Sequence, residues 1–216
     1  MPPDVCQLPL VGGHPALDLA NTLERGGSSP HDFLSDSSAL LRWSVLAGVI
    51  SDAEADQVGR AWGDEPAAAQ AGLVAVRDIR EGLYLVMLAV ITDADGGTAG
   101  DPVAARAALV ALHQRWSSAA ARARFVLDPS RVRLAYGTVP AMLVPDRIAE
   151  AARDVMLNAD LTRVRRCPVR EGGCGWLFLD QSRNGSRRWC RMADCGNAVK
   201  ARRLTERRRA ARPPLG

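Results

Sequence analysis

Apolar residues in the part of the chain before Thr162 recur mostly with the spacing of helices. In the longest such stretch, from Pro66 to Ile91, apolar positions lie three or four residues apart. That is the spacing of a helix face that packs against a core. Residues 93–101, rich in glycine and aspartate, are expected to end this helix. Its expected core positions are Leu73, Val76, Ile79, Leu83, Val86 and Val90.

Two shorter helices are expected before it. Residues 35–49 begin with a Ser or Asp cap, and residues 51–62 repeat the apolar pattern. In the second segment Ser51 is the expected N-cap and Glu54 completes a capping box. The inward positions of the first segment are Leu40, Leu41, Trp43 and Leu46.

Two more helices are expected after the long one. Residues 101–123 start with Asp101 as a cap and Pro102 at the first helical position, where proline is well suited because its missing N–H would have no partner. A last helix of this part starts near Pro145. The positions expected to face the core are Ala105, Leu109, Leu112, Trp116, Ile148, Ala152, Val155 and Met156.

Strands are expected to be few and short. Residues 124–139 contain two β-like runs on either side of Asp128-Pro129-Ser130, which indicates a hairpin. A short strand is also expected at the start of residues 7–24, and a loop over residues 25–32. The expected fold is therefore mainly α with a small β-hairpin element (α+β), and residues 1–162 form a helical body.

Charge divides the chain into two parts. Residues 163–216 contain 15 Lys and Arg against 4 Asp and Glu, whereas residues 1–162 contain 13 against 20. The net charge of +4 therefore combines −7 on the body with +11 on the C-terminal segment. A segment this basic suits a polyanion such as a nucleic acid. The alternative is a solvated basic surface without a partner.

The sequence also bears on compartment. The opening MPPDVCQLPLVGG lacks the basic start and the long apolar stretch of a signal peptide. No window approaches the roughly 18 uncharged apolar residues of a membrane span, so no membrane partner is expected. We expect a cytoplasmic protein. In that compartment structural disulfides are rare, and clustered cysteines more often hold a metal.

Four of the five cysteines lie in the basic segment, at Cys167, Cys174, Cys190 and Cys195. Their spacing, C-x6-C-x15-C-x4-C, gives two pairs separated by a distance common in four-cysteine zinc sites. Between the pairs, GWLFLDQS reads as a strand, SRNGS as a turn and RRWC as a returning strand. A helix is expected to begin near Asn197. Residues 163–216 are therefore predicted to form a treble-clef-like zinc finger around a structural Zn²⁺.

Other uses of these cysteines are less well supported. Disulfides conflict with the expected compartment, and a catalytic thiolate would need a base, whereas His14, His31 and His113 all lie outside the segment. A four-thiolate zinc site has no open position for a substrate water. Because hydrolase elbows, phosphate loops and paired metal-binding histidines are also absent from the sequence, we expect no enzyme. Cys6 is expected to be a bystander.

The segment CGWLFLDQSRNGSRRWCRMADCGNAVKARR, residues 174–203, closely resembles the CGNR zinc finger, a bacterial module. The matching pieces are LFLD, SRNGSRRWC, Met192 and the Cys-Gly-Asn at residues 195–197. The body resembles the ABATE domain that usually accompanies this finger, through ALDLANTL at residues 16–23 and the order of helices. The resemblance implies a stress-related transcription regulator. One departure is Ala198, where the family has an arginine, and it puts one contact in doubt.

DNA is therefore the expected partner. Arginine suits phosphate because its planar fork donates two hydrogen bonds at once, although Arg187 or Arg188 could instead pair with Asp180. The alternative is an RNA-binding or protein-interaction module that uses the same basic finger. Because a single finger binds modestly, a homodimer through the body is also expected. The expected nucleic-acid contacts are Arg183, Arg187, Arg188, Arg191, Lys200, Arg202, Arg203 and Arg207.

The body contains one polar island in an apolar setting, GGHPALDLANT. Its polar side chains could converge on a small effector. The alternative is that Asp18 and Asn21 cap helices or satisfy buried backbone groups. The expected effector residues are His14, Asp18, Asn21 and Thr22.

Overall fold

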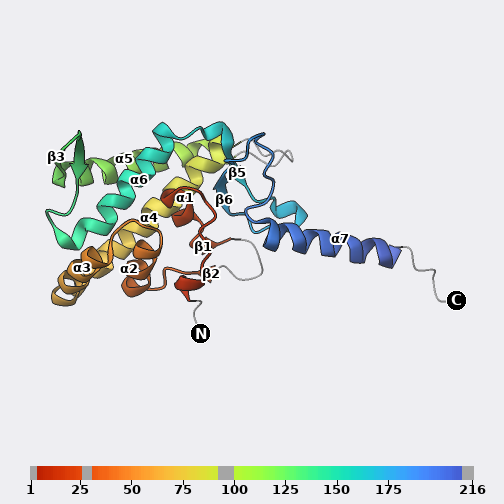
Figure 1. Ribbon diagram of the computed structural model, residues 1–216, viewed down its shortest axis with the longest axis horizontal. Helices are drawn as coiled ribbons and strands as arrows, with labels where there is room; N and C mark the ends of the chain where they lie inside the picture. Colours follow the sequence, from red (N-terminus) through yellow and green to blue (C-terminus); the bar gives the residue numbers. More distant parts are fainter. Residues whose placement is uncertain (1–3, 26–30, 92–99, 211–216) are drawn as a thin grey trace.

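The computed structural model describes residues 4–25, 31–91 and 100–210. Three long helices lie side by side and form the centre of the body, with α5 and α6 packed on each other and on α4 (Figure 1). Helix α1 packs against both α4 and α6, and α7 extends away from the body. The helices are α1 (Pro15–Ala20), α2 (Ser37–Leu46), α3 (Asp52–Asp64), α4 (Pro66–Val90), α5 (Pro102–Arg122), α6 (Leu143–Asn158) and α7 (Asn197–Ala210).

The described strands form three separate two-stranded antiparallel sheets. Short 3-10 turns lie at Val5–Gln7, Pro140–Met142, Leu161–Arg163 and Val169–Glu171, and a π-helical turn spans Met192–Gly196. None of the described helices is long and apolar enough to cross a membrane. The strand pairs are β1 (Leu23–Glu24) with β2 (His31–Asp32), β3 (Arg124–Asp128) with β4 (Arg131–Ala135), and β5 (Val164–Arg166) with β6 (Leu177–Leu179).

The predicted helix starts are confirmed. The Ser51 side chain accepts the Glu54 N–H, and Glu54 in turn accepts the Ser51 N–H at 2.9 Å, which makes the capping box at α3. The Asp101 carboxylate caps α5 by accepting the Val103 N–H at 2.8 Å. Each cap satisfies N–H groups that the helix itself leaves without partners.

Most predicted core positions are buried, Leu41, Trp116 and Met156 are partly buried, and three are exposed. Leu46, Val90 and Leu109 are exposed. Leu46 and Val90 are the last residues of α2 and α4, where the apolar spacing continues beyond the neighbours that could cover it. Helix α5 packs on the body through Ala105, Ala108, Leu112 and Ala119, and Leu109 lies one residue farther round the helix.

Two expectations for strands are wrong. The start of residues 7–24 is not a strand, since Gln7 ends a 3-10 turn. The returning strand over residues 187–190 does not form either, and β6 pairs with β5 instead. The Asp180 carboxylate accepts the N–H groups of Ser182 and Arg187, each at 2.9 Å, and this local bonding replaces a β ladder.

Other expectations have mixed outcomes. The hairpin over residues 124–139 is confirmed as β3–β4. The loop predicted at residues 25–32 and the break at residues 93–101 fall mostly outside the described residues. The division between body and finger near Thr162 stays a prediction.

Candidate metal centre and basic surface

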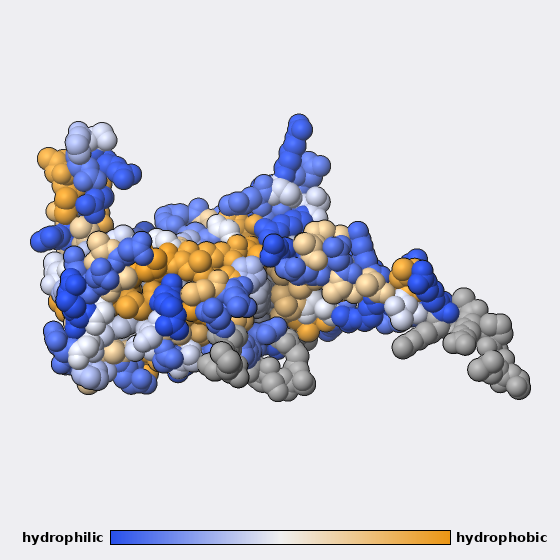
Figure 2. All heavy atoms as spheres, turned by 60° about the horizontal axis from the view of Figure 1, so that its bottom comes forward, coloured by the Kyte–Doolittle hydropathy of each residue, from blue (hydrophilic) through white to orange (hydrophobic). Residues whose placement is uncertain are grey.

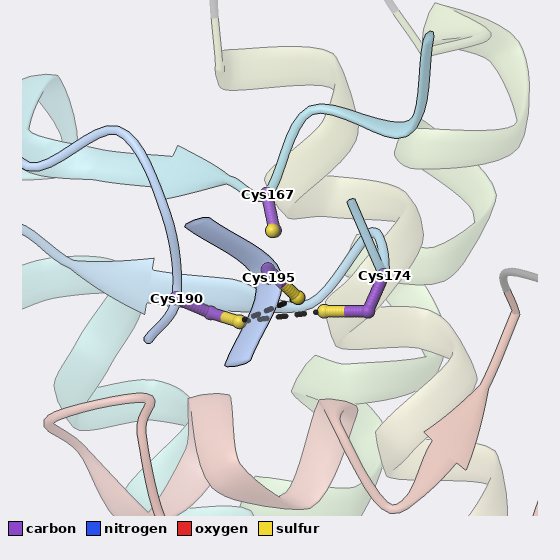
Figure 3. Close-up of side chains that lie close together, drawn as sticks. All are labelled: Cys167, Cys174, Cys190 and Cys195. Carbon is purple, nitrogen blue, oxygen red and sulfur yellow. Dashed lines mark hydrogen bonds between the residues drawn. The ribbon is translucent and has the colours of Figure 1, made fainter. Parts of the chain in front are cut away.

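The four clustered cysteines meet at one point although they come from four different segments. Cys167 follows β5, Cys174 precedes β6, Cys190 lies in the loop after β6, and Cys195 lies in the π-helical turn before α7. Their sulfur atoms all lie within 4.8 Å of one another. The Sγ atoms of Cys174 and Cys190 are 3.4 Å apart, and those of Cys190 and Cys195 are 3.7 Å apart (Figure 3).

These separations fit a tetrahedral metal. With Zn–S bonds of about 2.3 Å, the sulfurs of a tetrahedral site lie about 3.8 Å apart, whereas a disulfide brings two sulfurs to about 2.05 Å. All five cysteines are free thiols in the structure. Cys6 is exposed and is not one of the four clustered residues. The donor set therefore fits Zn²⁺ and leaves no position open for a substrate.

The thiols strongly perturb one another. Hydrogen bonds from the thiols of Cys174 and Cys190 lower the pKa of Cys167. The bond to Cys167 and burial raise the pKa of Cys174 and of Cys190. Sulfurs this close cannot all be thiolates unless a cation compensates their charge. Zn²⁺ would supply that charge when bound, and all four sulfurs could then act as ligands.

Small residues allow the segment between Cys167 and Cys174 to fold tightly. The backbone of Gly172 has a φ of +89°, in the left-handed region that favours glycine. A Cβ on Gly173 would lie 2.7 Å from the Cys167 sulfur, so any larger residue there would push that sulfur away. The buried ring of Phe178 packs against Cys167 and Cys190. The metal centre thus has a small apolar core of its own.

Arg187 organises the loop that carries Cys190. Its guanidinium donates to the carbonyl oxygens of Trp189 at 3.2 Å, Val11 at 3.1 Å, and Cys190. It also lies over the Phe178 ring, 4.5 Å from the ring centroid. Arg187 was expected to contact nucleic acid, but the structure directs its side chain into the finger.

Asn21 connects the body to the finger. Its amide group donates to the carbonyl of Leu177 at 2.9 Å, and its side-chain oxygen accepts the N–H of the same residue at 2.8 Å. Two residues farther along the same strand, the Leu179 N–H donates to the carbonyl of Gly12 at 2.8 Å. Helix α1 and the segment before it therefore hold β6, the strand that leads from Cys174 into the finger.

The other predicted effector residues also serve the backbone. Asp18 accepts the Gly12 N–H at 2.7 Å, and burial raises its pKa although the N–H groups of Gly12 and Val11 partly oppose this. The Thr22 hydroxyl donates to the Leu19 carbonyl at 2.7 Å. His14 caps α1 and lies 3.2 Å from a carboxylate oxygen of Asp154. Within the described part of the chain, His14 lines a hollow whose lining does not include Asp18, Asn21 or Thr22.

The predicted nucleic-acid residues fall into three groups. Arg187 points inward, as described above. Four others have protein partners, since Arg188 and Arg203 both bind Glu171, Arg191 lies 3.4 Å from Asp194, and Arg202 reaches the Gly172 carbonyl at 3.5 Å. Among the described residues, Arg183, Lys200 and Arg207 are exposed and have no hydrogen-bond or ion-pair partner. The space-filling view shows α7 covered largely by hydrophilic residues (Figure 2).

Glu171 is a functional candidate that sequence reasoning missed. It lies in the turn between Cys167 and Cys174 and binds one arginine before Cys190 and one on α7. A carboxylate between two of the clustered cysteines, in a segment with only four acidic residues, is the signal that could have found it. By binding both Arg188 and Arg203, Glu171 connects the turn between Cys167 and Cys174 to the loop before Cys190 and to α7.

Two family models match the chain. The CGNR zinc finger model matches residues 163–208. The ABATE model, described as "Putative stress-induced transcription regulator", matches residues 13–159, which is more than half of the chain. No curated protein matches the chain. The resemblance expected from LFLD, SRNGSRRWC and ALDLANTL is thereby confirmed, and the protein belongs to the ABATE family and carries a CGNR zinc finger.

Proposed function

We propose that the protein is a zinc-containing, DNA-binding transcription regulator without catalytic activity. The observation that carries this proposal is the position of α7. The helix starts two residues after Cys195, one of the four clustered cysteines, and extends away from the body (Figure 1). The metal would therefore fix the start of a basic helix whose far end is free to meet a polyanion.

The exposure of α7 supports this role. All residues from Ala201 to Arg208 are exposed, and only Val199 and the preceding Gly196 are buried at the base of the helix. A helix that is polar all round gains little from packing on its own protein. Lys200, Arg203 and Arg207 recur three and four residues apart and share one side of the helix, where Arg203 also binds Glu171. Such a strip suits a row of phosphates, which supply affinity and register rather than sequence specificity.

The assay is equilibrium binding of the zinc-loaded chain to duplex DNA and to structured RNA at matched salt. If about five phosphates are neutralised, log K falls against log salt with a slope near −4 to −5. Lys200→Ala and Arg207→Ala should each make that slope about one unit shallower. Arg60→Ala, an exposed arginine on α3, is the matched control and should leave it unchanged.

The outcomes separate the two classes of binding. A preference for duplex DNA with this slope supports the proposal. A preference for structured RNA would favour the alternative module, and binding that does not respond to salt would contradict both. A homodimer would present two fingers to two half-sites, which single fingers need for tight binding.

For effector sensing we propose the hollow that His14 lines. It measures about 350 Å³ and is bordered by Tyr136, Arg147, Glu150 and Asp154. A small polar molecule bound there would lie at the start of α1, and Asn21, the C-cap of the same helix, holds β6. Tyr136→Phe should reduce the change in DNA affinity that such an effector causes, while DNA affinity without the effector stays unchanged. Equal effector responses of the variant and the parent chain would contradict this assignment.

A further inference from the structure

The hairpin β3–β4 carries an apolar face that nothing in the described chain covers. Residues directly opposite each other in an antiparallel pair lie on the same face, and Phe125 pairs with Leu134 while Leu127 pairs with Val132. Phe125 is 81 % exposed, Leu127 is 82 % exposed and Val132 is 62 % exposed. One side of the hairpin is therefore wholly apolar, and most of it faces water.

The opposite face of the hairpin is mostly charged, with Val126 and Ala135 as its apolar members. It carries Arg124, Arg131 and Arg133, and Asp128 lies 2.9 Å from Arg133. Figure 2 shows the hairpin standing out from the body as a projection with hydrophobic residues on it. A two-stranded hairpin without a covered face is only marginally stable in water. The amphipathic arm thus has the form of an element that docks on another apolar surface.

A matching recess lies between α5 and α6 on the same chain. This apolar groove has a volume of about 270 Å³, and its lining includes Leu109, Leu112, Trp116, Met156 and Leu157. Val103 and Val110 are exposed on the side of α5 that faces away from its buried residues. Helix α5 therefore has apolar residues both toward the core and toward water, which is typical of a helix covered on both sides.

We propose that the α5–α6 groove is occupied by the hairpin of a second copy, and reciprocally, in a two-fold dimer. Each copy has both the projecting arm and the recess, as a two-fold interface requires because it reuses one surface on both subunits. The arm leaves the end of α5 through a single residue, Ala123, so arm and groove belong to one continuous surface.

The area is sufficient for a stable dimer. Seven apolar side chains on the arm, on α5 and at the end of α6 are exposed by 45–82 %. At about 120 Å² for a fully exposed side chain of this kind, they expose roughly 560 Å² of apolar surface. One partner contributes about 800 Å² to an interface of standard size, of which a little more than half is apolar. The dimer is formed by the acidic part of the chain and leaves the two basic fingers free. It does not depend on nucleic-acid binding.

The first test is the association state of the zinc-loaded full chain by sedimentation equilibrium without nucleic acid. We expect a dimer whose dissociation constant rises roughly 100-fold or more in the double variant Phe125→Ser, Leu127→Ser. Leu46→Ser, an exposed leucine on α2, is the matched control and should leave association unchanged. Thermal unfolding checks that both variants remain folded.

The second test identifies the occupant by cross-linking, in chains that also carry Cys6→Ser and are zinc-loaded. Chains with Leu127→Cys are mixed with chains with Leu157→Cys and treated with a short bis-maleimide. The mixture should give a cross-linked pair that neither variant gives alone, and Leu46→Cys in place of Leu157→Cys should not. A dimer without this product would overturn the reciprocal arms. A monomeric chain would contradict the proposal that a second copy occupies the groove, and the groove would then be a docking site for a different protein.

Discussion

Replacing Asn21 by leucine tests the junction between body and finger. The Asn21 side chain is 1 % exposed and forms hydrogen bonds with both the N–H and the carbonyl of Leu177. Leucine has the same branching at Cγ and is larger, so it excludes water from the site while it removes both hydrogen-bond partners. The variant therefore leaves two buried backbone groups without hydrogen bonds.

The expected loss follows from these two groups. A buried donor or acceptor without a partner costs about 1–3 kcal/mol, and two of them give a loss of about 2–6 kcal/mol in the free energy of unfolding. Relaxation of β6 would place the value near the lower end. Because typical domains are stable by only about 5–15 kcal/mol, a loss of this size is readily measured.

The assay is urea unfolding of the zinc-loaded chain, followed by circular dichroism and by tryptophan fluorescence. Agreement of the two probes is required, since a body and a finger could unfold separately. Asn184→Leu, at an exposed asparagine in the finger, is the control and should change stability by less than about 0.5 kcal/mol. If Asn21→Leu is as stable as the parent chain, the junction does not depend on this side chain, and its predicted role toward an effector regains support.

Three further predictions follow from single residues. Arg187→Ala should lower the free energy of unfolding by about 3 kcal/mol, because it leaves carbonyl groups around the Cys190 loop without a donor, and it should leave the salt slope of DNA binding unchanged. Arg183→Ala should instead leave the free energy of unfolding unchanged and make the salt slope shallower. Burial alone would raise the pKa of Asp32, but hydrogen bonds from Arg80 outweigh it and lower that pKa. The stability that Asp32 contributes is therefore present above its unfolded pKa of about 3.9 and is lost as pH falls through the folded pKa. Asp32→Asn should make the free energy of unfolding fall less steeply at acid pH. An unchanged dependence on pH would contradict the pairing of Asp32 with Arg80. Ala198→Arg, which restores the family's residue, should make the salt slope about one unit steeper, and an unchanged slope would mean that this position does not contact phosphate.

Local patterns predicted the helices well because the signals act over a few residues. The capping box of Ser51 and Glu54 and the cap at Asp101 need only neighbours within one helical turn. The four cysteines could also be grouped from their spacing and residue type, because four cysteines clustered in such a segment most often bind a metal.

Long-range contacts were not predictable in the same way. Asn21 and Leu177 are 156 positions apart, and the sequence near either residue gives no signal that the two are in contact. The returning strand was expected from RRWC, but the Asp180 carboxylate takes the N–H of Arg187 that a ladder would have used. The exposed positions of Leu46 and Val90 depend on where neighbouring elements end, which apolar spacing does not record.

X-ray absorption at the zinc edge of the purified chain tests the central claim most directly, because it reports both the metal and its ligands. The account predicts one zinc per chain with four sulfur ligands at about 2.3 Å. Zinc with nitrogen or oxygen among its ligands, or a chain that contains no zinc, would contradict the claim that Cys167, Cys174, Cys190 and Cys195 together hold the base of α7.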